Sequence, residues 1–385
     1  MTNQSKLFFL RAAVSVALLF SLNWASELSQ KGEFEQRYLW VVRNALTSKS
    51  SINQMINFAT VNRFNHILVQ VRGRGDAYYN SMIVPKSQLI NDANFDPLAY
   101  LIPRAKEKGI HVHAWVNTYL LWSSRSKPVQ DDHLLYSHPE WIDQNKQIQL
   151  NLSEEMQNFN SGKNGNEGFY LSPNHPKVNS YLLTVFRDLI ENYELDGLHL
   201  DYVRFHDSEY GQNPAAIAYF RKYNGMKAYP PEETFGVSEW NDHRRKAITD
   251  LVRETKNLIE TVRPGVELSA AVKPNLYQAR ERYFQEWDVW LAAGYLDKAV
   301  VMNYTKNLKE FADNIDIMYD NLPSKYRKKI VMGIATYNQP ADQVVDKVKY
   351  TRVTRFKGIS FFSYNVMAQN PQYFRLIKKI LYPRG

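Results

Sequence analysis

The chain has 385 residues, of which 44% are apolar and 23% are charged, a balance that excludes a disordered or collagen-like protein. Lysine and arginine outnumber aspartate and glutamate by 48 to 39, which gives a formal charge of +9. Because the chain contains no cysteine, disulfide scaffolds, thiolate metal sites and cysteine nucleophiles are all excluded.

Residues 1–25 are typical of a secretory signal peptide rather than of the fold. Lys6 and Arg11 precede an apolar stretch, Ala12–Leu22, which is too short to span a bilayer by itself. We expect cleavage near Ala25; the alternatives are an uncleaved membrane anchor or a buried helix. The protein is therefore expected to be exported to the periplasm or cell envelope, or secreted. There a basic protein meets anionic polymers before nucleic acid, and no nucleic-acid-binding motif is present.

The rest of the chain alternates short β-rich runs with stretches of helical spacing. The runs are mostly continuous and apolar, as expected for strands of a parallel sheet that is buried on both faces. The expected strands are Arg37–Arg43, His66–Val71, His111–Asn117, Leu195–Val203, Glu267–Val272, Lys298–Met302, Ile330–Ala335 and Gly358–Phe362.

Each expected strand is followed by an expected helix. These helices are Ser51–Val61, Asp96–Lys108, Pro176–Tyr193, Ser238–Val262, Arg282–Ala293, Leu308–Asn321, Ala341–Thr354 and Pro371–Leu381. Strand–helix pairs in this order predict an α/β fold, a single (β/α)8 TIM barrel over residues 37–382. Long loops, Trp122–His175 and His206–Val237, follow the third and fourth strands. In this fold such loops build the active-site face.

Several motifs lie where the second, third and fourth strands meet their loops. They are Gln70–Ser81 (QVRGRGDAYYNS), His113–Tyr119 (HAWVNTY), His138–Ile142 (HPEWI), Tyr170–Val178 (YLSPNHPKV) and Asp196–Phe205 (DGLHLDYVRF). Further matches are Trp240, Arg244-Arg245, Asn303-Tyr304 and Phe362–Tyr364. In this order they resemble the bacterial glycosyl-hydrolase-like family 10, over about Arg37 to Tyr382. The resemblance implies an envelope or secreted glycosidase that acts on cell-wall glycan, best of all peptidoglycan strands stripped of peptide.

One position departs from the family pattern. Where the pattern commonly has two adjacent aspartates at the end of the fourth strand, this chain has Asp201 followed by Tyr202. Asp201 is then the sole carboxylate at this strand tip, which puts in doubt any mechanism that needs both aspartates.

Asp201 is the first candidate for catalysis. It ends a buried strand on the active-site face, where a charged side chain is costly unless it is functional or paired. Hydrolysis of a glycosidic bond usually needs two carboxyl groups. We predict Asp201 as the key carboxylate; the alternative is a structural ion pair with Arg204 or Arg72. His199 shares its strand face and either orients the carboxylate or is a hydrogen-bonded histidine of the barrel interior.

The second carboxylate must come from a loop, because the tips of strands five to eight carry no acidic residue. The candidates are Asp76, Asp207 and Glu209. Asp76 is favoured as the acid because it lies in a family-like Gly-Asp-Ala stretch; the alternative is an aspartate that holds a glycine-rich turn. This gap leaves open a non-catalytic glycan-binding barrel of the cell envelope.

Substrate contacts are expected from aromatic, amide and cationic side chains at strand ends and in loops. Aromatic rings stack on sugars, although Trp115 fits the barrel core equally well, and cations either bind an anionic glycan or neutralise Asp201. The candidates are Arg43, Arg72, Trp115, Asn117, Tyr119, Trp122, Tyr202, Arg204, Lys273, Asn303, Tyr304, Tyr337 and Tyr364. No cofactor or metal is expected. His111 and His113 share a face, but His111 opens its strand and is expected to be a buried structural histidine.

Overall fold

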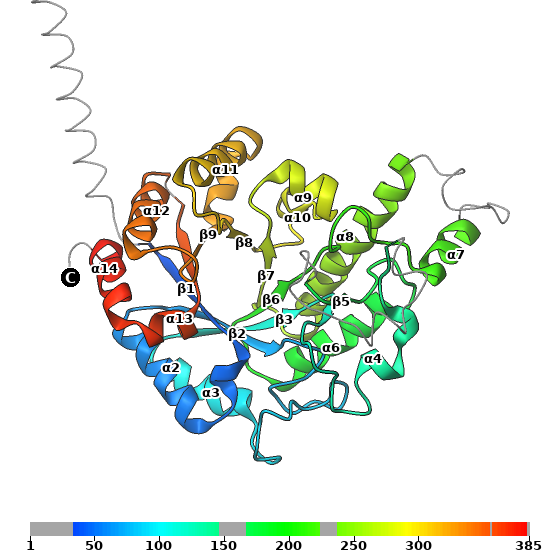
Figure 1. Ribbon diagram of the computed structural model, residues 1–385, viewed down its shortest axis with the longest axis horizontal. Helices are drawn as coiled ribbons and strands as arrows, with labels where there is room; N and C mark the ends of the chain where they lie inside the picture. The colour runs from blue at the N-terminus through cyan, green and yellow to red at the C-terminus, as the bar shows by residue number, and fades with distance from the viewer. Residues whose placement is uncertain (1–33, 146–166, 224–236, 355, 383–385) are drawn as a thin grey trace, which may run out of the picture.

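Within the residues that the computed structural model describes (34–145, 167–223, 237–354 and 356–382), parallel strands close into a barrel inside a ring of helices (Figure 1). Each strand pairs with the next along the chain, and β1 pairs with β10 to close the barrel. The strands are β1 (Gln36–Val41), β2 (His66–Arg72), β3 (His111–Asn117), β6 (Gly197–Asp201), β7 (Glu267–Val272), β8 (Lys298–Met302), β9 (Ile330–Ala335) and β10 (Gly358–Phe362). The predicted (β/α)8 barrel is confirmed.

The helices cover the outside of the barrel. They are α2 (Lys49–Val61), α3 (Pro97–Glu107), α6 (Val178–Asn192), α8 (Val237–Val262), α9 (Leu276–Tyr283), α10 (Trp287–Ala293), α11 (Leu308–Asn321), α12 (Ala341–Val353), α13 (Tyr364–Gln369) and α14 (Pro371–Leu381). The single helix expected over Arg282–Ala293 was wrong. Phe284 takes a left-handed conformation, with φ of 56°, which ends α9 and lets α10 begin after a short turn.

Side chains fill the half of the barrel interior at the amino-terminal ends of the strands, and a pocket occupies the other half. Tyr38, Trp40 and Trp115 belong to a cluster inside the barrel, separate from the larger core between strands and helices. Below them, His66 Nδ1 lies 2.9 Å from His113 Nε2. His111 is not buried as expected: its side chain is 53% exposed at the bottom rim, where Nδ1 lies 3.0 Å from an Asp196 carboxylate oxygen.

The described parts of the two long loops lie at the mouth of the barrel. Their described parts form a small antiparallel sheet, β4 (Leu120–Trp122) with β5 (Phe169–Tyr170), and the short helices α4 (Leu134–Ser137), η2 (Pro139–Trp141) and α7 (Pro214–Tyr223). The carboxylate of Asp143 ties them together, because its Oδ1 accepts the N–H groups of Gln144 and Gly211 and the hydroxyl of Ser172 at 3.0–3.2 Å. The elements that surround the mouth are therefore fixed to one another.

The expected signal peptide, residues 1–25, lies outside the described residues. Within the described ranges, no helix is both long and apolar enough to cross a membrane.

Candidate active site

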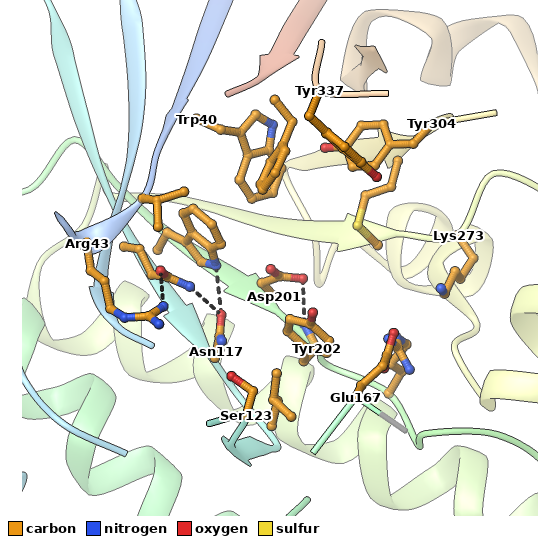
Figure 2. Close-up of a pocket in the computed structure, with 17 residues that line it drawn as sticks. Trp40, Arg43, Asn117, Ser123, Glu167, Asp201, Tyr202, Lys273, Tyr304 and Tyr337 are labelled. Atoms are coloured by element: carbon orange, nitrogen blue, oxygen red, sulfur yellow. Dashed lines mark hydrogen bonds and ion pairs between the residues drawn. The ribbon is translucent and has the colours of Figure 1, made fainter. Parts of the chain in front are cut away.

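A pocket of about 530 Å³ opens at the carboxyl ends of the barrel strands (Figure 2). Its volume is in the range of ligand-binding clefts, and in this fold such a position is that of the active site. Nine side chains expected from the sequence line it: Arg43, Trp115, Asn117, Asp201, Tyr202, Arg204, Lys273, Tyr304 and Tyr337.

Asp201 lies at the end of β6 and is 6% exposed. Its Oδ1 accepts the N–H of Tyr202 at 2.7 Å, and Tyr202 holds a left-handed backbone with φ of 51°. That conformation costs a non-glycine residue on the order of 1 kcal/mol, and such strain gathers at functional sites. Burial raises the pKa of Asp201 to about 6 although this N–H opposes the shift, so the carboxyl group is partly protonated near neutral pH.

Glu167, which the sequence analysis did not single out, supplies a second carboxylate. It precedes β5, lines the same pocket and bonds Arg204 Nη2 at 2.8 Å and the hydroxyl of Tyr170. Burial raises the pKa of Glu167, but the Arg204 guanidinium and these hydrogen bonds lower it by more, to about 2. Glu167 is therefore ionised under the conditions in which Asp201 still carries a proton.

The structural ion pair considered for Asp201 is not formed within the described residues. Arg204 bonds Glu167 instead, and Arg72 Nη1 donates to the backbone oxygen of Asn117 at 2.5 Å. Figure 2 shows Tyr202 between the Asp201 and Glu167 carboxylates in this view, with Lys273 beyond them. The pocket thus contains two carboxyl groups in unlike environments, the arrangement by which enzymes separate an acid from an ionised partner.

Two cations of the pocket form no ion pair among the described residues, although the Glu167 and Asp201 carboxylates act on one of them, Lys273, from a greater distance. Arg43 donates from Nη1 to the Gln70 side-chain oxygen at 2.8 Å and forms no ion pair there. Lys273 Nζ lies 4.4 Å from the centroid of the Tyr283 ring, and burial lowers the pKa of Lys273 to about 8. Since half-buried charges are normally paired, these side chains are suited to an anionic ligand.

Aromatic rings form the wall opposite the carboxylates. Trp40 and Trp115 meet edge to face, with ring centroids 4.8 Å apart, and Trp115 therefore belongs to both the barrel core and the pocket. Tyr337 is 55% exposed at the rim, and the buried hydroxyl of Tyr304 has no hydrogen-bond partner in the described part of the chain. The site therefore offers flat faces and a free hydroxyl to a sugar.

Nine candidate side chains, all within the described ranges, do not line this pocket: Arg72, Asp76, Tyr119, Trp122, His199, Asn303, Tyr364 and the alternative carboxylates Asp207 and Glu209. Asp76 accepts the N–H of Arg74 at 3.2 Å, as a turn-holding aspartate does. His199 Nδ1 lies 2.8 Å from the Ser269 hydroxyl in the barrel interior. Tyr119 and Asn303 bond the helix layer, through Asn179 and through the Phe311 backbone oxygen respectively.

Other residues of the pocket were not expected: Trp40, Val42, Gln70, Leu120, Ser123, Glu167, Met302 and Phe362. For Trp40 and Val42 the period of two along β1 carried a usable signal, because Tyr38 also faces inward. Glu167 had no such signal, since it lies at the end of a long insertion. Within the described residues, no group of three or more histidine, aspartate or glutamate side chains is arranged to hold a metal ion.

Comparison with known proteins connects this geometry to one family. The model of the glycosyl hydrolase-like 10 family matches residues 35–348. Glycosyl hydrolase DigH of Escherichia coli is 24% identical over an alignment of 318 residues that covers 77% of this chain and 62% of DigH. Glycosyl hydrolase YngK of Bacillus subtilis is 23% identical over an alignment of 264 residues that covers 66% of this chain and 43% of YngK. The matches thus span less than two thirds of either relative.

Solved structures show the same fold at low identity. The glycoside hydrolase domain of PgaB (BpsB) from Bordetella bronchiseptica superposes with a TM-score of 0.65 and 13% identity, covering 90% of this chain and 98% of that domain. The catalytic domain of β-amylase from Paenibacillus polymyxa gives a TM-score of 0.58 at 13% identity, covering 92% of this chain and 99% of that domain.

Proposed function

The chain belongs to the glycosyl hydrolase-like 10 family, and from this premise we propose that it hydrolyses glycosidic bonds in a bacterial cell-wall or envelope polysaccharide. The observation that carries the proposal is the pair of carboxyl groups, Asp201 and Glu167, in one pocket at the barrel mouth with pKa values of about 6 and about 2. Glycosidases need one carboxylic acid and one carboxylate, and this pair supports that division of roles.

In the proposed mechanism Asp201 is the general acid. It protonates the oxygen of the leaving sugar, while the Tyr202 N–H stabilises the carboxylate that remains. Glu167, held by Arg204, stabilises the positive charge that develops at the anomeric carbon. Water then forms the new C–O bond at this carbon, and the proton that it loses replaces the one that Asp201 gave to the leaving sugar, so the acid is restored. This assignment replaces Asp76, which lies outside the pocket, as the second carboxylate.

We propose an anionic glycan as substrate, and the candidate that we favour is peptidoglycan strands stripped of peptide. Arg43 and Lys273 support this choice, because each is a pocket cation that forms no ion pair in the described residues. Alternate sugars of that polymer bear a carboxylate once the peptide is removed, which matches such cations. An exported protein would meet this polymer in the periplasm or envelope, and residues 1–25 are proposed to direct the export.

The purified protein should be incubated with peptide-free cell-wall glycan, with the same wall bearing its peptides, and with a neutral chitin oligosaccharide. New reducing ends are expected mainly from the peptide-free glycan. Absence of reducing ends from all three would contradict hydrolysis. Tight binding of the glycan without cleavage would instead identify the alternative, a non-catalytic glycan-binding barrel.

A further inference from the structure

A second cavity, of about 740 Å³, lies beside the barrel mouth between α7, the first half of α8 and the loop before α6. In this fold the helices run back from the mouth, so the amino-terminal ends of α6 and α8 belong to the active-site side. In Figure 1, α7 lies outside the ring of barrel helices, on the side of α4 and α6. The barrel closes without α7, so packing against the barrel core does not explain the exposed side chains of α7.

Exposed aromatic rings form one side of this cavity. Tyr219 is 40% exposed and Tyr223 is 78% exposed, and their ring centroids lie 5.2 Å apart. Behind them Phe220 packs edge to face on Trp240 of α8 at 4.9 Å, in a small core of its own that also includes Ile217. Because this core already fixes α7, the two tyrosine rings are free to offer apolar faces to a ligand.

Polar atoms without partners belong to two further residues that line the cavity. Asn174 is 5% exposed, lines the cavity, and its Nδ2 donor has no acceptor within the described ranges. His243 Nε2 likewise has no partner there, and burial lowers the pKa of His243 to about 4, so the ring is neutral at pH 7. Buried polar atoms are rarely left unpaired unless a ligand or water completes them.

The charge of this cavity differs from that of the barrel pocket. Lys246 bonds Asp250 at 2.5 Å, and Asp242 bonds Arg245 at 2.5 Å. Glu239 lines the cavity without an ion pair in the described part of the chain. The cavity therefore presents carboxylate and amide groups to hydroxyls, and none of its described lining residues is a cation free to bind an anion.

The two sites are joined by a short stretch of chain. Glu167 of the barrel pocket and Asn174 of the second cavity are seven residues apart through β5, which places them at most about 25 Å apart. Tyr119, two residues after Asn117 of the pocket, donates its hydroxyl to Asn179 of the cavity at 2.8 Å. We infer that the second cavity is a distal contact site for the same polysaccharide, which holds one of the neutral, hydroxyl-rich sugars that alternate with the carboxylate-bearing ones, while Asp201 acts on a bond further along. This inference rests on the proposed function.

The test compares long and short substrates. Tyr219→Ala combined with Tyr223→Ala should raise KM about tenfold for long peptide-free cell-wall glycan. Turnover of a short aryl glycoside, too short to reach α7, should stay unchanged, which also reports correct folding. Tyr277→Ala is the matched control, because Tyr277 is 61% exposed and lines neither cavity. If the double variant loses stability, Tyr223→Ala alone serves, since that ring is 78% exposed.

Binding separates failure of this inference from failure of the proposed function. Retention of the Asp201→Asn protein on insoluble peptide-free glycan should fall about tenfold with the tyrosine substitutions and not with Tyr277→Ala. If the wild type cleaves long glycan and the double variant matches it in KM and retention, the distal site is wrong while the glycosidase stands. If the wild type cleaves nothing, the proposed function is wrong, and retention on the glycan then tests the distal site by itself. Retention that is unchanged by the tyrosine substitutions overturns the distal site, and a tenfold fall supports it as a glycan contact.

Discussion

The two ends of the barrel both bury ionisable side chains, but they satisfy them differently. At the bottom the groups bond one another: the Tyr38 hydroxyl donates to Glu267 at 3.1 Å, and His66 lies within hydrogen-bond distance of His113. At the mouth Asp201 receives a backbone N–H but no ion pair in the described ranges, and Lys273 faces the pocket. At the bottom the ionisable groups lie against one another, with His113 Nδ1 as a buried ring nitrogen that lacks a hydrogen-bond partner in the described residues, whereas the groups at the mouth line an open pocket and can bind a ligand.

The same contrast is visible in protonation. Burial lowers the pKa of both His113 and His199 to about 3, so the interior histidines are neutral and carry no buried charge. At the mouth burial raises the pKa of Asp201 to about 6 and lowers that of Lys273 to about 8, so both groups titrate close to physiological pH. Ionised Asp201 and Lys273 at the mouth therefore lower the stability of the fold, but they can exchange protons with a substrate near neutral pH.

Glu167→Gln tests the carboxylate that completes the mouth. Removing its charge should lower kcat about 10²–10³-fold on glycan, because charge stabilisation in the transition state is lost. Since Glu167 also raises the pKa of Asp201, the alkaline limb of the pH–rate profile should move to lower pH. The control is Asp76→Asn, a carboxylate outside the pocket, which should change kcat by less than about threefold. Equal losses in the two variants would contradict the assignment.

Acid should destabilise the barrel interior. In the unfolded chain histidine has a pKa near 6.5, whereas the folded values for His113 and His199 are about 3. Between these values the unfolded state binds more protons, so the free energy of unfolding should fall by several kcal/mol as pH drops from about 6.5 to 3. Urea unfolding measured along this range should show a shallower slope for His113→Gln than for the wild type. An unchanged slope would mean that His113 is not kept neutral by the fold.

Asp201→Asn should stabilise the protein, opposite to the effect of most buried polar changes. The folded pKa of Asp201, about 6, lies above the usual value for aspartate, so the fold favours the protonated side chain. The contribution of protonated Asp201 to the free energy of unfolding is therefore complete below about pH 4 and is lost as pH rises through 6. Removing the ionisable group should therefore raise the free energy of unfolding by about 1–3 kcal/mol at pH 7, with little change at pH 4. Destabilisation at both pH values would indicate a structural carboxylate.

Lys273→Met tests the unpaired cation. KM for peptide-free cell-wall glycan should rise about tenfold, because a charge-assisted hydrogen bond is lost, while KM for a neutral chitin oligosaccharide should change little. Lys309→Met is the matched control, since the Lys309 side chain is 82% exposed in a surface pair with Asp313. Similar changes on both substrates would show that Lys273 does not select for an anion.

The barrel was predictable because each strand–helix unit has its own local signal. Continuous apolar runs marked the strands, and Asp96 with Pro97 marked the start of α3, where the Asp96 carboxylate caps two backbone N–H groups at 3.0–3.1 Å. The break between α9 and α10 was not predictable, because Phe284 carries no residue-type signal for a left-handed backbone.

The site was predictable only where strands end. Asp201 and Lys273 follow directly from their positions at the ends of β6 and β7. Glu167 was missed because its place depends on Arg204, a partner 37 residues away, and on the β4–β5 pairing within a long insertion. Asp76 was favoured because of its motif, whereas its side chain holds its own loop. Strand periodicity thus predicts where a strand residue points, but not how a long loop returns to the mouth.

Turnover of Asp201→Asn on peptide-free cell-wall glycan tests the central claim most directly. Asparagine keeps the size of the side chain and removes the acid, so new reducing ends should form at least about 10³-fold more slowly than with the wild type, from a protein that is fully folded. Wild-type turnover by the folded variant would contradict the account and show that Asp201 is not the acid of this site.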